Sequence, residues 1–325
     1  SILEPSQNEA YIRSLIKKGQ EGGVVPKWDC GANYTGCMIG YHYVSLLADN
    51  YVKGYRNYDI EEAYKAALRA AEYSTEGITE ACPEWLYPYI MPIGRKYNHE
   101  VGYVPCDKDN EAVAKDLEYA FNDWCISVLA DSLGKKEDAV RYAGYAKNYK
   151  TYFDPEIGFM RGKSLAGEWR TPFSPNHSEH RVDDFCEGNS YQWSWFVPHD
   201  PMGLAELHGG KEGMIKKLDE LFTASSEMEG DNVSADISGL IGQYAHGNEP
   251  SHHITHFYNY MGQPWKTQEL VDQILHTLYF NAPDGLSGNE DCGQMSAWYI
   301  LNAMGFYQVC AGNPVYSIGR PLFKE

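Results

Sequence analysis

Residues 111–134 read EAVAKDLEYAFNDWCISVLADSLG, and this stretch decides the fold class. Its apolar side chains recur at spacings of three and four, which is typical of a helix that buries one face. These side chains are Val113, Leu117, Phe121, Trp124 and Val128. Gly134 follows as the expected C-terminal stop. Because alternating apolar–polar runs are few and short elsewhere, the sequence predicts an all-α fold.

The same helical periodicity extends outward from this stretch over most of the chain. It predicts about ten helices, near residues 7–19, 34–53, 60–77, 111–133, 136–152, 189–208, 211–225, 251–262, 265–280 and 293–305. The connections are of two kinds, short turns and long loops rich in Gly, Pro and Asp. The long loops are expected near residues 20–33, 78–110, 153–188, 226–250 and 281–292.

Short and long connections alternate along the chain. Because consecutive helices of an up-down array run in opposite directions, every long loop should lie on the same rim, where functional residues concentrate. The alternation favours a closed ring of helical hairpins, an (α/α) barrel. No shift in composition marks an internal boundary, so we expect a single domain over residues 1–325.

The charge of the chain excludes several classes of partner. It has 45 acidic and 27 basic residues, for a net charge of −18, and no cluster of cations. Nucleic acids and anionic membrane surfaces are therefore not expected as partners. No apolar stretch reaches the roughly 18 residues of a membrane span. None of the eight cysteines forms a C-x-x-C pair, which argues against a zinc ribbon.

The loop near 153–188 leads into CEGNSYQWSWFVPHD, residues 186–200. Glu187 stands beside a glycine and just ahead of four aromatic residues. In an apolar sugar pocket its pKa would rise, so that it could act as a general acid. The alternative is an ordinary acid in the first turn of a helix, stabilised by the helix dipole.

The loop near 226–250 ends in HGNEPSHH, residues 246–253. Asn248 and Glu249 offer the oxygen ligands that calcium prefers. The alternative assigns Glu249 to helix capping and the histidines to packing. A zinc site using His252 and His256 is less favoured, because the pair lacks the glutamate of H-E-x-x-H.

The loop near 281–292 leads into DGLSGNEDCGQ, residues 284–294. Asp291 is placed to act as a base, with Glu290 orienting it or contacting a ligand. The alternative is a solvated turn that caps the following helix. Glycoside hydrolysis needs two carboxylates on opposite sides of one bond, and these loops supply them. Trp28, Asn33 and Trp85 in the first two loops would add stacking and hydroxyl-binding groups.

Several of these motifs together resemble family 92 of the glycoside hydrolases. The similarity rests on NYTGCMIG, FNDWC, CEGNSYQWSWFVPHD, IGQYAHGNEPSHH, PWKTQELV and GNEDCGQMSAWYILNAMGFY, which occur in the family's order between residues 32 and 307. The resemblance implies an (α/α)6 barrel and an exo-acting, calcium-dependent α-mannosidase that inverts the anomeric carbon. Glu187 matches the family's general acid and Asp291 its general base.

The resemblance also implies the surroundings of these two acids. Glu249 and Asn248 would belong to the Ca2+ site, where the ion binds hydroxyls of the sugar. The expected substrate-binding residues are Trp28, Asn33, Trp85, Trp193, His199, Asp200, His252 and Glu290. Relatives selective for α-1,2 links carry a His-Glu pair where this chain has Ala235-Asp236, so strict α-1,2 specificity is not expected.

Partners and location follow from the resemblance as expectations. The substrates would be mannose-containing glycans of the N-glycan or yeast-mannan type, and the enzyme would be periplasmic or secreted. The family's N-terminal β-sandwich and first barrel segment lie outside this chain, so its barrel would be incomplete and its cleft would need them. A glycosidase of another sugar specificity and a non-catalytic mannose-binding relative remain the alternatives.

Overall fold

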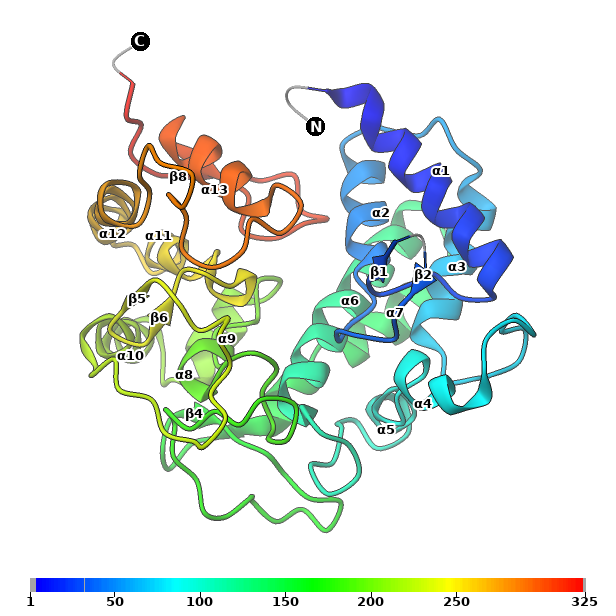
Figure 1. Ribbon diagram of the computed structural model, residues 1–325, viewed down its shortest axis with the longest axis horizontal. Helices are drawn as coiled ribbons and strands as arrows, with labels where there is room; N and C mark the ends of the chain where they lie inside the picture. Colours follow the sequence, from blue (N-terminus) through cyan, green and yellow to red (C-terminus); the bar gives the residue numbers. More distant parts are fainter. Residues whose placement is uncertain (1–3, 32, 324–325) are drawn as a thin grey trace. The chain divides into compact units, whose positions relative to one another are not determined.

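The computed structural model describes residues 4–31 and 33–323. Helices dominate this part of the chain, and its strands form only two-residue antiparallel pairs (Figure 1). The prediction of an all-α fold is confirmed. The chain divides into two compact units. The first runs to Thr151 and includes Ala311–Pro314, and the second comprises Tyr152–Cys310 and the residues from Val315 onward. The single domain over 1–325 stays a prediction.

The first unit is built around one buried helix, α6 (Figure 1). Its elements are α1 (Pro5–Gly22), β1 (Asp29–Cys30), β2 (Asn33–Tyr34), α2 (Tyr43–Val52), α3 (Ile60–Ala71), η1 (Glu84–Leu86), α4 (Tyr87–Ile90), α5 (Gly94–Glu100), α6 (Ala112–Ser132), α7 (Lys136–Tyr145) and η2 (Asn148–Tyr152), whose last residue belongs to the second unit. Residues 112–126 of α6 are all buried except Trp124, because α2, α3, α5 and α7 pack around the helix. The predicted stop at Gly134 is present, with a φ of 74°.

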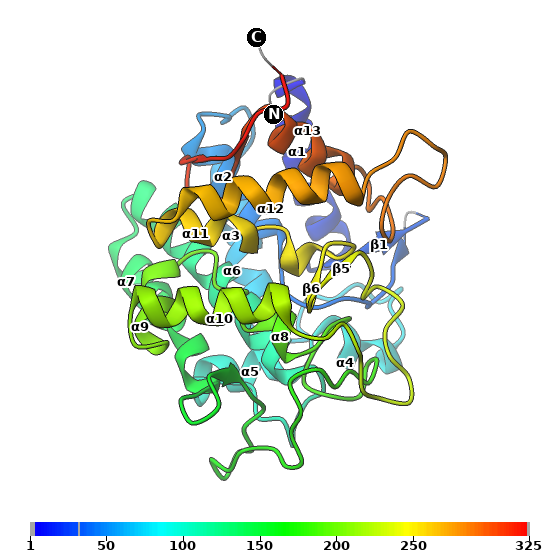
Figure 2. The same ribbon diagram turned by 90° about the vertical axis from the view of Figure 1, so that its left-hand side faces the viewer.

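The second unit carries shorter helices joined by long loops. Its elements are β3 (Phe153–Asp154), β4 (Phe159–Met160), α8 (Ser190–Trp193), α9 (Pro201–Leu207), α10 (Lys211–Thr223), β5 (Leu240–Ile241), β6 (Tyr244–Ala245), η3 (Glu249–Ser251), η4 (Ile254–His256), α11 (Phe257–Tyr260), α12 (Pro264–Thr277), α13 (Gln294–Ala303), β7 (Phe306–Tyr307) and β8 (Ser317–Ile318). Helices α10 and α12 lie near each other in Figure 2, and Lys266 of α12 forms an ion pair of 2.6 Å with Asp219 of α10.

Backbone conformation shortens one predicted helix. The helix expected over 34–53 begins only at Tyr43. Gly36, Met38 and Gly40 precede it with φ values of 69°, 67° and 72°. A right-handed helix cannot contain left-handed residues, so this segment forms a loop instead.

Other helix boundaries also differ from those predicted from the apolar periodicity. The helix expected over 189–208 is split into α8 and α9, and Pro201 opens the second of them. The region 251–262 is divided into η4 and the single turn of α11. The loop expected over 78–110 contains η1, α4 and α5. Apolar spacing alone does not reveal where a backbone turn interrupts a helix.

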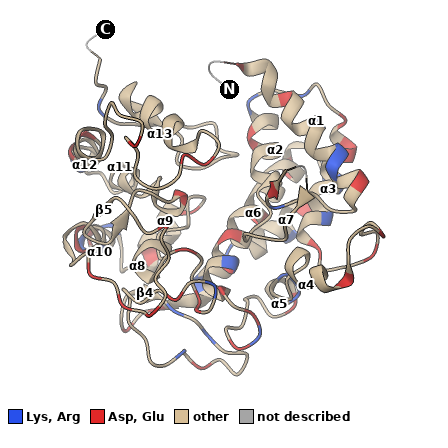
Figure 3. Ribbon diagram, viewed as in Figure 1, with Lys and Arg blue, Asp and Glu red and all other residues tan. Residues whose placement is uncertain are grey.

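Three long loops of the second unit contact one another, those near 153–188, 226–250 and 281–292. Ser178 donates its backbone N–H to Glu229 O at 2.9 Å. Gly247 lies so close to Gly288 that a Cβ on Gly288 would come within 2.6 Å of Gly247 O. Figure 3 colours several positions of these loops as Asp or Glu. Loops far apart in the sequence thus meet within one unit.

Candidate functional site

Glu187 lies on a tight turn ahead of α8. Its φ of 47° is in the left-handed region, which costs free energy for a residue with a side chain. Helix α8 begins at Ser190, and its N-cap is Asn189. Glu187 therefore precedes the cap by two residues, and the alternative that it is an ordinary first-turn acid is wrong.

Two side chains hold this turn. The indole Nε1–H of Trp193 donates to Cys186 O at 2.7 Å. The amide Nδ2 of Asn248 donates to Glu187 O at 3.1 Å and lies 3.4 Å from the carboxylate oxygen Oε2. Trp193 is only 2% exposed, so its indole is part of the support of Glu187. Its contact with sugar stays a prediction.

Asp291 occupies a second strained turn, directly before α13. It and Cys292 have φ values of 50° and 55°. Partial burial raises the pKa of the Asp291 carboxyl, and the nearby carboxylate of Asp236 raises it further. A hydrogen bond with the carboxyl of Glu249 acts in the opposite direction and lowers this pKa. Both predicted catalytic acids thus lie on backbone conformations that need support from the surrounding structure.

Adjacent residues connect these two acids. Asn248 contacts Glu187, and the next residue, Glu249, contacts Asp291. Glu187 and Asp291 are about one hundred positions apart in the sequence. The structure therefore brings both predicted catalytic acids to one short segment of the second unit.

The donor groups around this segment suit a hard divalent cation. The carboxyls of Glu249 and Asp291 share a hydrogen bond, and Asp236 and Glu290 add negative charge nearby. Asn248 Oδ1 accepts the backbone N–H of Glu249 at 3.2 Å, which leaves one of its lone pairs for another partner. Oxygen donors of this kind fit calcium. Among the described residues, no three His, Cys, Asp or Glu side chains form a ready metal-binding group.

The histidines after Glu249 are engaged with protein atoms. His252 Nε2 lies 2.9 Å from His246 O, and its Nδ1 lies 3.1 Å from the amide of Gln294. His253 Nε2 lies 2.7 Å from Trp195 O. Both ring nitrogens of His256 also have partners, Asn302 and Ser317. Burial lowers the pKa of each of His252, His253 and His256 to about 4. These contacts support the packing alternative for the histidines over a zinc site.

The remaining predicted residues of this unit have local structural roles. Asp200 is the N-cap of α9, and its carboxylate accepts the N–H of Gly203 at 2.8 Å. Glu290 Oε1 accepts the N–H of Ser296, in the first turn of α13, at 3.3 Å. This contact is of the capping type expected in the alternative for that loop. The sugar contacts of Asp200, Glu290, His199 and His252 stay predictions.

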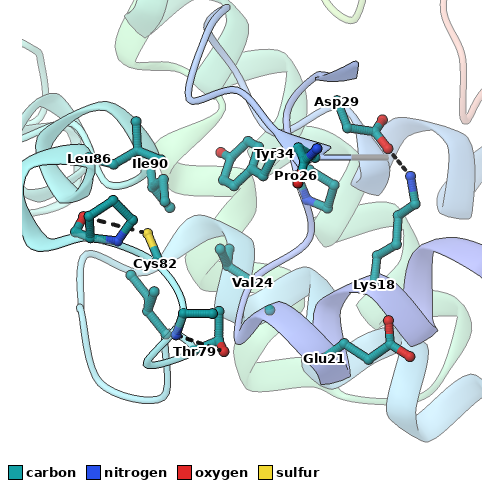
Figure 4. Close-up of a pocket in the computed structure, with 15 residues that line it drawn as sticks. Lys18, Glu21, Val24, Pro26, Asp29, Tyr34, Thr79, Cys82, Leu86 and Ile90 are labelled. Atoms are coloured by element: carbon teal, nitrogen blue, oxygen red, sulfur yellow. Dashed lines mark hydrogen bonds and ion pairs between the residues drawn. The ribbon is translucent and has the colours of Figure 1, made fainter. Parts of the chain in front are cut away.

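Three predicted sugar-binding residues lie in the first unit. Trp28 is 47% exposed and Trp85, in η1, is 71% exposed, so both present an apolar surface to solvent. Asn33 lines a pocket of about 470 Å³ with an apolar side formed by residues such as Val24 and Ile90 (Figure 4). An ion pair between Lys18 and Asp29 lies at the same pocket. The assignment of these residues to sugar binding stays a prediction.

Three amide side chains that support the turn at Glu187 were not among the residues predicted from the sequence. Asn189 and Gln192 form a capping box, in which each side chain bonds the backbone N–H of the other residue. Its N-x-x-Q spacing is a signal that the sequence does contain. Gln243 bonds the same pair, but no local pattern identifies it.

Gly188 offers a direct test of this tight packing. A Cβ on Gly188 would lie 2.7 Å from Trp193 Nε1, and the buried indole cannot move away without losing its bond to Cys186. We expect Gly188→Ala to lower the free energy of unfolding by about 1–3 kcal/mol and to displace Glu187. Thermal unfolding and activity measure the two effects. Gly144→Ala is the control, because nothing lies within 4 Å of that Cβ; equal behaviour of both variants would contradict the expectation.

Known proteins are similar to this chain in sequence. The family model described as the glycosyl hydrolase family 92 catalytic domain matches residues 1–325. A curated relative from Arthroderma benhamiae, named an uncharacterized secreted glycosidase, is 25% identical over 312 residues, which cover 86% of this chain and 36% of that protein.

Solved structures are similar over nearly the whole chain. A family GH92 α-mannosidase from Bacteroides thetaiotaomicron, in complex with mannoimidazole, is 41% identical with a TM-score of 0.86. The match covers 98% of this chain and 40% of that chain. An inverting GH92 mannosidase from B. thetaiotaomicron VPI-5482 is 40% identical with a TM-score of 0.84, over 99% of this chain and 43% of that chain.

The chain thus spans less than half the length of these solved relatives. Its similarity to them confirms the predicted fold class, the all-α (α/α)6 type of these catalytic domains. The family model covers the two strained acids and the segment that connects them, together with every other described element. The chain belongs to glycosyl hydrolase family 92.

Proposed function

We propose that this chain carries the two catalytic acids of an exo-α-mannosidase that removes terminal α-linked mannose with inversion. The observation that carries the proposal is the pair Asn248–Glu249, whose neighbouring side chains contact Glu187 and Asp291. An inverting glycosidase needs an acid and a base at one sugar. The solved relatives are mannosidases, which supports the choice of mannose.

In the proposed reaction, each acid moves one proton. Glu187 gives its proton to the leaving oxygen as the bond from that oxygen to the anomeric carbon breaks. Asp291 takes a proton from a water whose oxygen bonds to the opposite face of the same carbon. Inversion requires room for this water, so we expect the two carboxyls to lie about 6.5–9.5 Å apart when substrate is bound.

Glu249 and Asn248 are the residues that would hold calcium. When bound there, the ion would supply a template and a Lewis acid for the sugar hydroxyls. Without it, the negative charges of Asp236 and Glu290 add to partial burial in raising the pKa of Asp291, whereas the hydrogen bond with Glu249 lowers it. The oxygen-rich donor set is what supports calcium rather than zinc.

Mannose-containing glycans of the N-glycan or yeast-mannan type are the proposed substrates. The name of the curated relative supports an extracellular or periplasmic location. In the described part of the chain, no helix is both long and apolar enough to cross a bilayer. We further propose that a β-sandwich portion and a barrel segment outside this chain complete the cleft, since the solved relatives are more than twice as long.

Proton NMR of a mannobiose digest tests the proposal. With the full-length protein, we expect β-mannose to appear first, because water attacks the face opposite the α-link. After treatment with EDTA, release should fall by at least tenfold, and added calcium should restore it. The measured quantities are the anomer ratio at early times and the initial rate.

Other outcomes would support the alternatives. Early α-mannose would mean retention and would contradict the assignment of Asp291 as a base. Faster hydrolysis of aryl glucosides or galactosides than of aryl mannosides would indicate another sugar specificity. Mannose binding without turnover would indicate a non-catalytic relative. Restoration by zinc but not by calcium would indicate a zinc hydrolase.

A further inference from the structure

Gln243 is a completely buried amide at the tip of the hairpin formed by β5 and β6. The two strands pair Ile241 with Tyr244, so Gly242 and Gln243 form the turn. Gly242 has a φ of 60°, and a Cβ there would lie 2.4 Å from Leu221 O. The hairpin tip is therefore fixed closely against the end of α10.

The side chain of Gln243 uses all of its polar groups within the protein. Its Nε2 donates to Ser225 O at 2.6 Å and to Glu227 O at 3.0 Å. Its Oε1 accepts Asn189 Nδ2 at 3.0 Å, and its backbone oxygen accepts Gln192 Nε2 at 2.8 Å. Gln243 thus bonds both members of the capping box that begins α8.

This capping box lies directly behind the turn that carries Glu187. Asn189 and Gln192 are themselves 0% and 2% exposed, so water does not replace a lost amide partner easily. Trp193, the next residue of α8, bonds Cys186 O on the other side of Glu187. The position of α8 therefore determines where the left-handed turn at Glu187 lies.

The segment that follows the β5–β6 hairpin contacts Glu187 directly. Strand β6 leads through His246 to Asn248, which bonds the backbone oxygen of Glu187. Figure 2 shows β5, β6 and α8 in the same region, and contacts between α8 and β6 place them side by side. One hairpin thus fixes both the start of α8 and the turn ahead of it.

We propose that Gln243 is a positioning residue for the general acid, holding Glu187 at the leaving-group oxygen through Asn189, Gln192 and α8. This inference rests on the proposed function. A strained residue keeps its conformation only where surrounding contacts determine it, and here these contacts are buried amides. A shift of the acid by about 1 Å costs on the order of a hundredfold in rate.

The test uses the full-length protein and two substrates that differ in their need for an acid. A mannobiose has a poor leaving group that must be protonated, whereas 2,4-dinitrophenyl α-mannoside has one that leaves without a proton. We expect Gln243→Met to lower kcat for the mannobiose by about tenfold to a hundredfold and to change kcat for the dinitrophenyl substrate less than twofold. Gln243→Glu keeps an acceptor for Asn189 but loses both donations to Ser225 O and Glu227 O, so it should separate the two substrates at least as strongly as Gln243→Met.

Asn302→Ala is the matched control, since Asn302 is a buried amide of the same unit that bonds His256 and Trp298. It should lower thermal stability without separating the two substrates. An equal loss on both substrates with Gln243→Met would overturn the inference and leave Gln243 a purely structural residue. Unchanged kcat on both would overturn it as well. Inactivity of the wild type on both substrates would instead refute the proposed function.

Discussion

Glu187→Gln is expected to lower kcat/KM for a mannobiose by about 10²–10⁴-fold, the usual contribution of a general acid. The amide keeps the shape of the side chain and a partner for Asn248, which lies 3.4 Å from Oε2. It cannot give a proton to the leaving oxygen. Hydrolysis of 2,4-dinitrophenyl α-mannoside should therefore be largely retained. Steady-state kinetics on the two substrates measures the difference.

Asp291→Asn should not distinguish the two substrates, because the attacking water must be activated whichever leaving group departs. It should slow both substrates together. Glu269→Gln on the exposed surface of α12 is the matched control and should leave both rates unchanged. Full activity of Glu187→Gln on the mannobiose would exclude this residue as the acid.

Acid should destabilise the second unit steeply, because its buried histidines resist protonation. The pKa values of His252, His253 and His256 fall from 6.5 to about 4 in the folded state. Their contribution to stability is therefore present above pH 6.5 and is lost as the pH falls towards 4. Each site contributes a slope of about 1.4 kcal/mol per pH unit between these values.

Asp183 has the opposite effect on the pH dependence of stability. Burial raises its pKa from 3.8 to about 6, so its contribution is present below pH 3.8 and is lost as the pH rises through 6. His208, whose pKa burial also lowers to about 4, is a fourth such histidine of this unit, so offsetting one of the four against this carboxyl leaves a net slope of about 4 kcal/mol per pH unit. The pKa of His246 is lowered further by burial, which steepens the slope. Urea unfolding at fixed calcium concentration, followed by tryptophan fluorescence between pH 7 and 4.5, measures it.

His253→Gln tests the origin of that slope. Its amide can still donate to Trp195 O, the partner of His253 Nε2, but it does not titrate. We expect the slope to fall by about 1.4 kcal/mol per pH unit. His276→Gln on the outside of α12 should not change it, since the His276 side chain is 62% exposed. Identical slopes for all three proteins would refute the histidine explanation.

The sequence supplied the catalytic candidates but not their contacts. Glu187 and Asp291 stand in glycine-flanked motifs, and the capping box of Asn189 and Gln192 can be recognised from its spacing. The left-handed conformations of Glu187 and Asp291 could not be predicted, because a residue with a side chain avoids positive φ unless its surroundings impose it. The burial of Trp193 could not be predicted either, since an aromatic residue is found both in protein cores and in sugar pockets.

The sequence by itself determined the helical fold class, because helix periodicity is a local property that residues three and four apart express directly. It also contained the acids, and its order of motifs indicated the family. Only the tertiary structure decided that Asn248 and Glu249 join the two acids and that Gln243 supports one of them. These partners are about forty to sixty residues apart, so the path of the folded chain, rather than any local pattern, places them in contact.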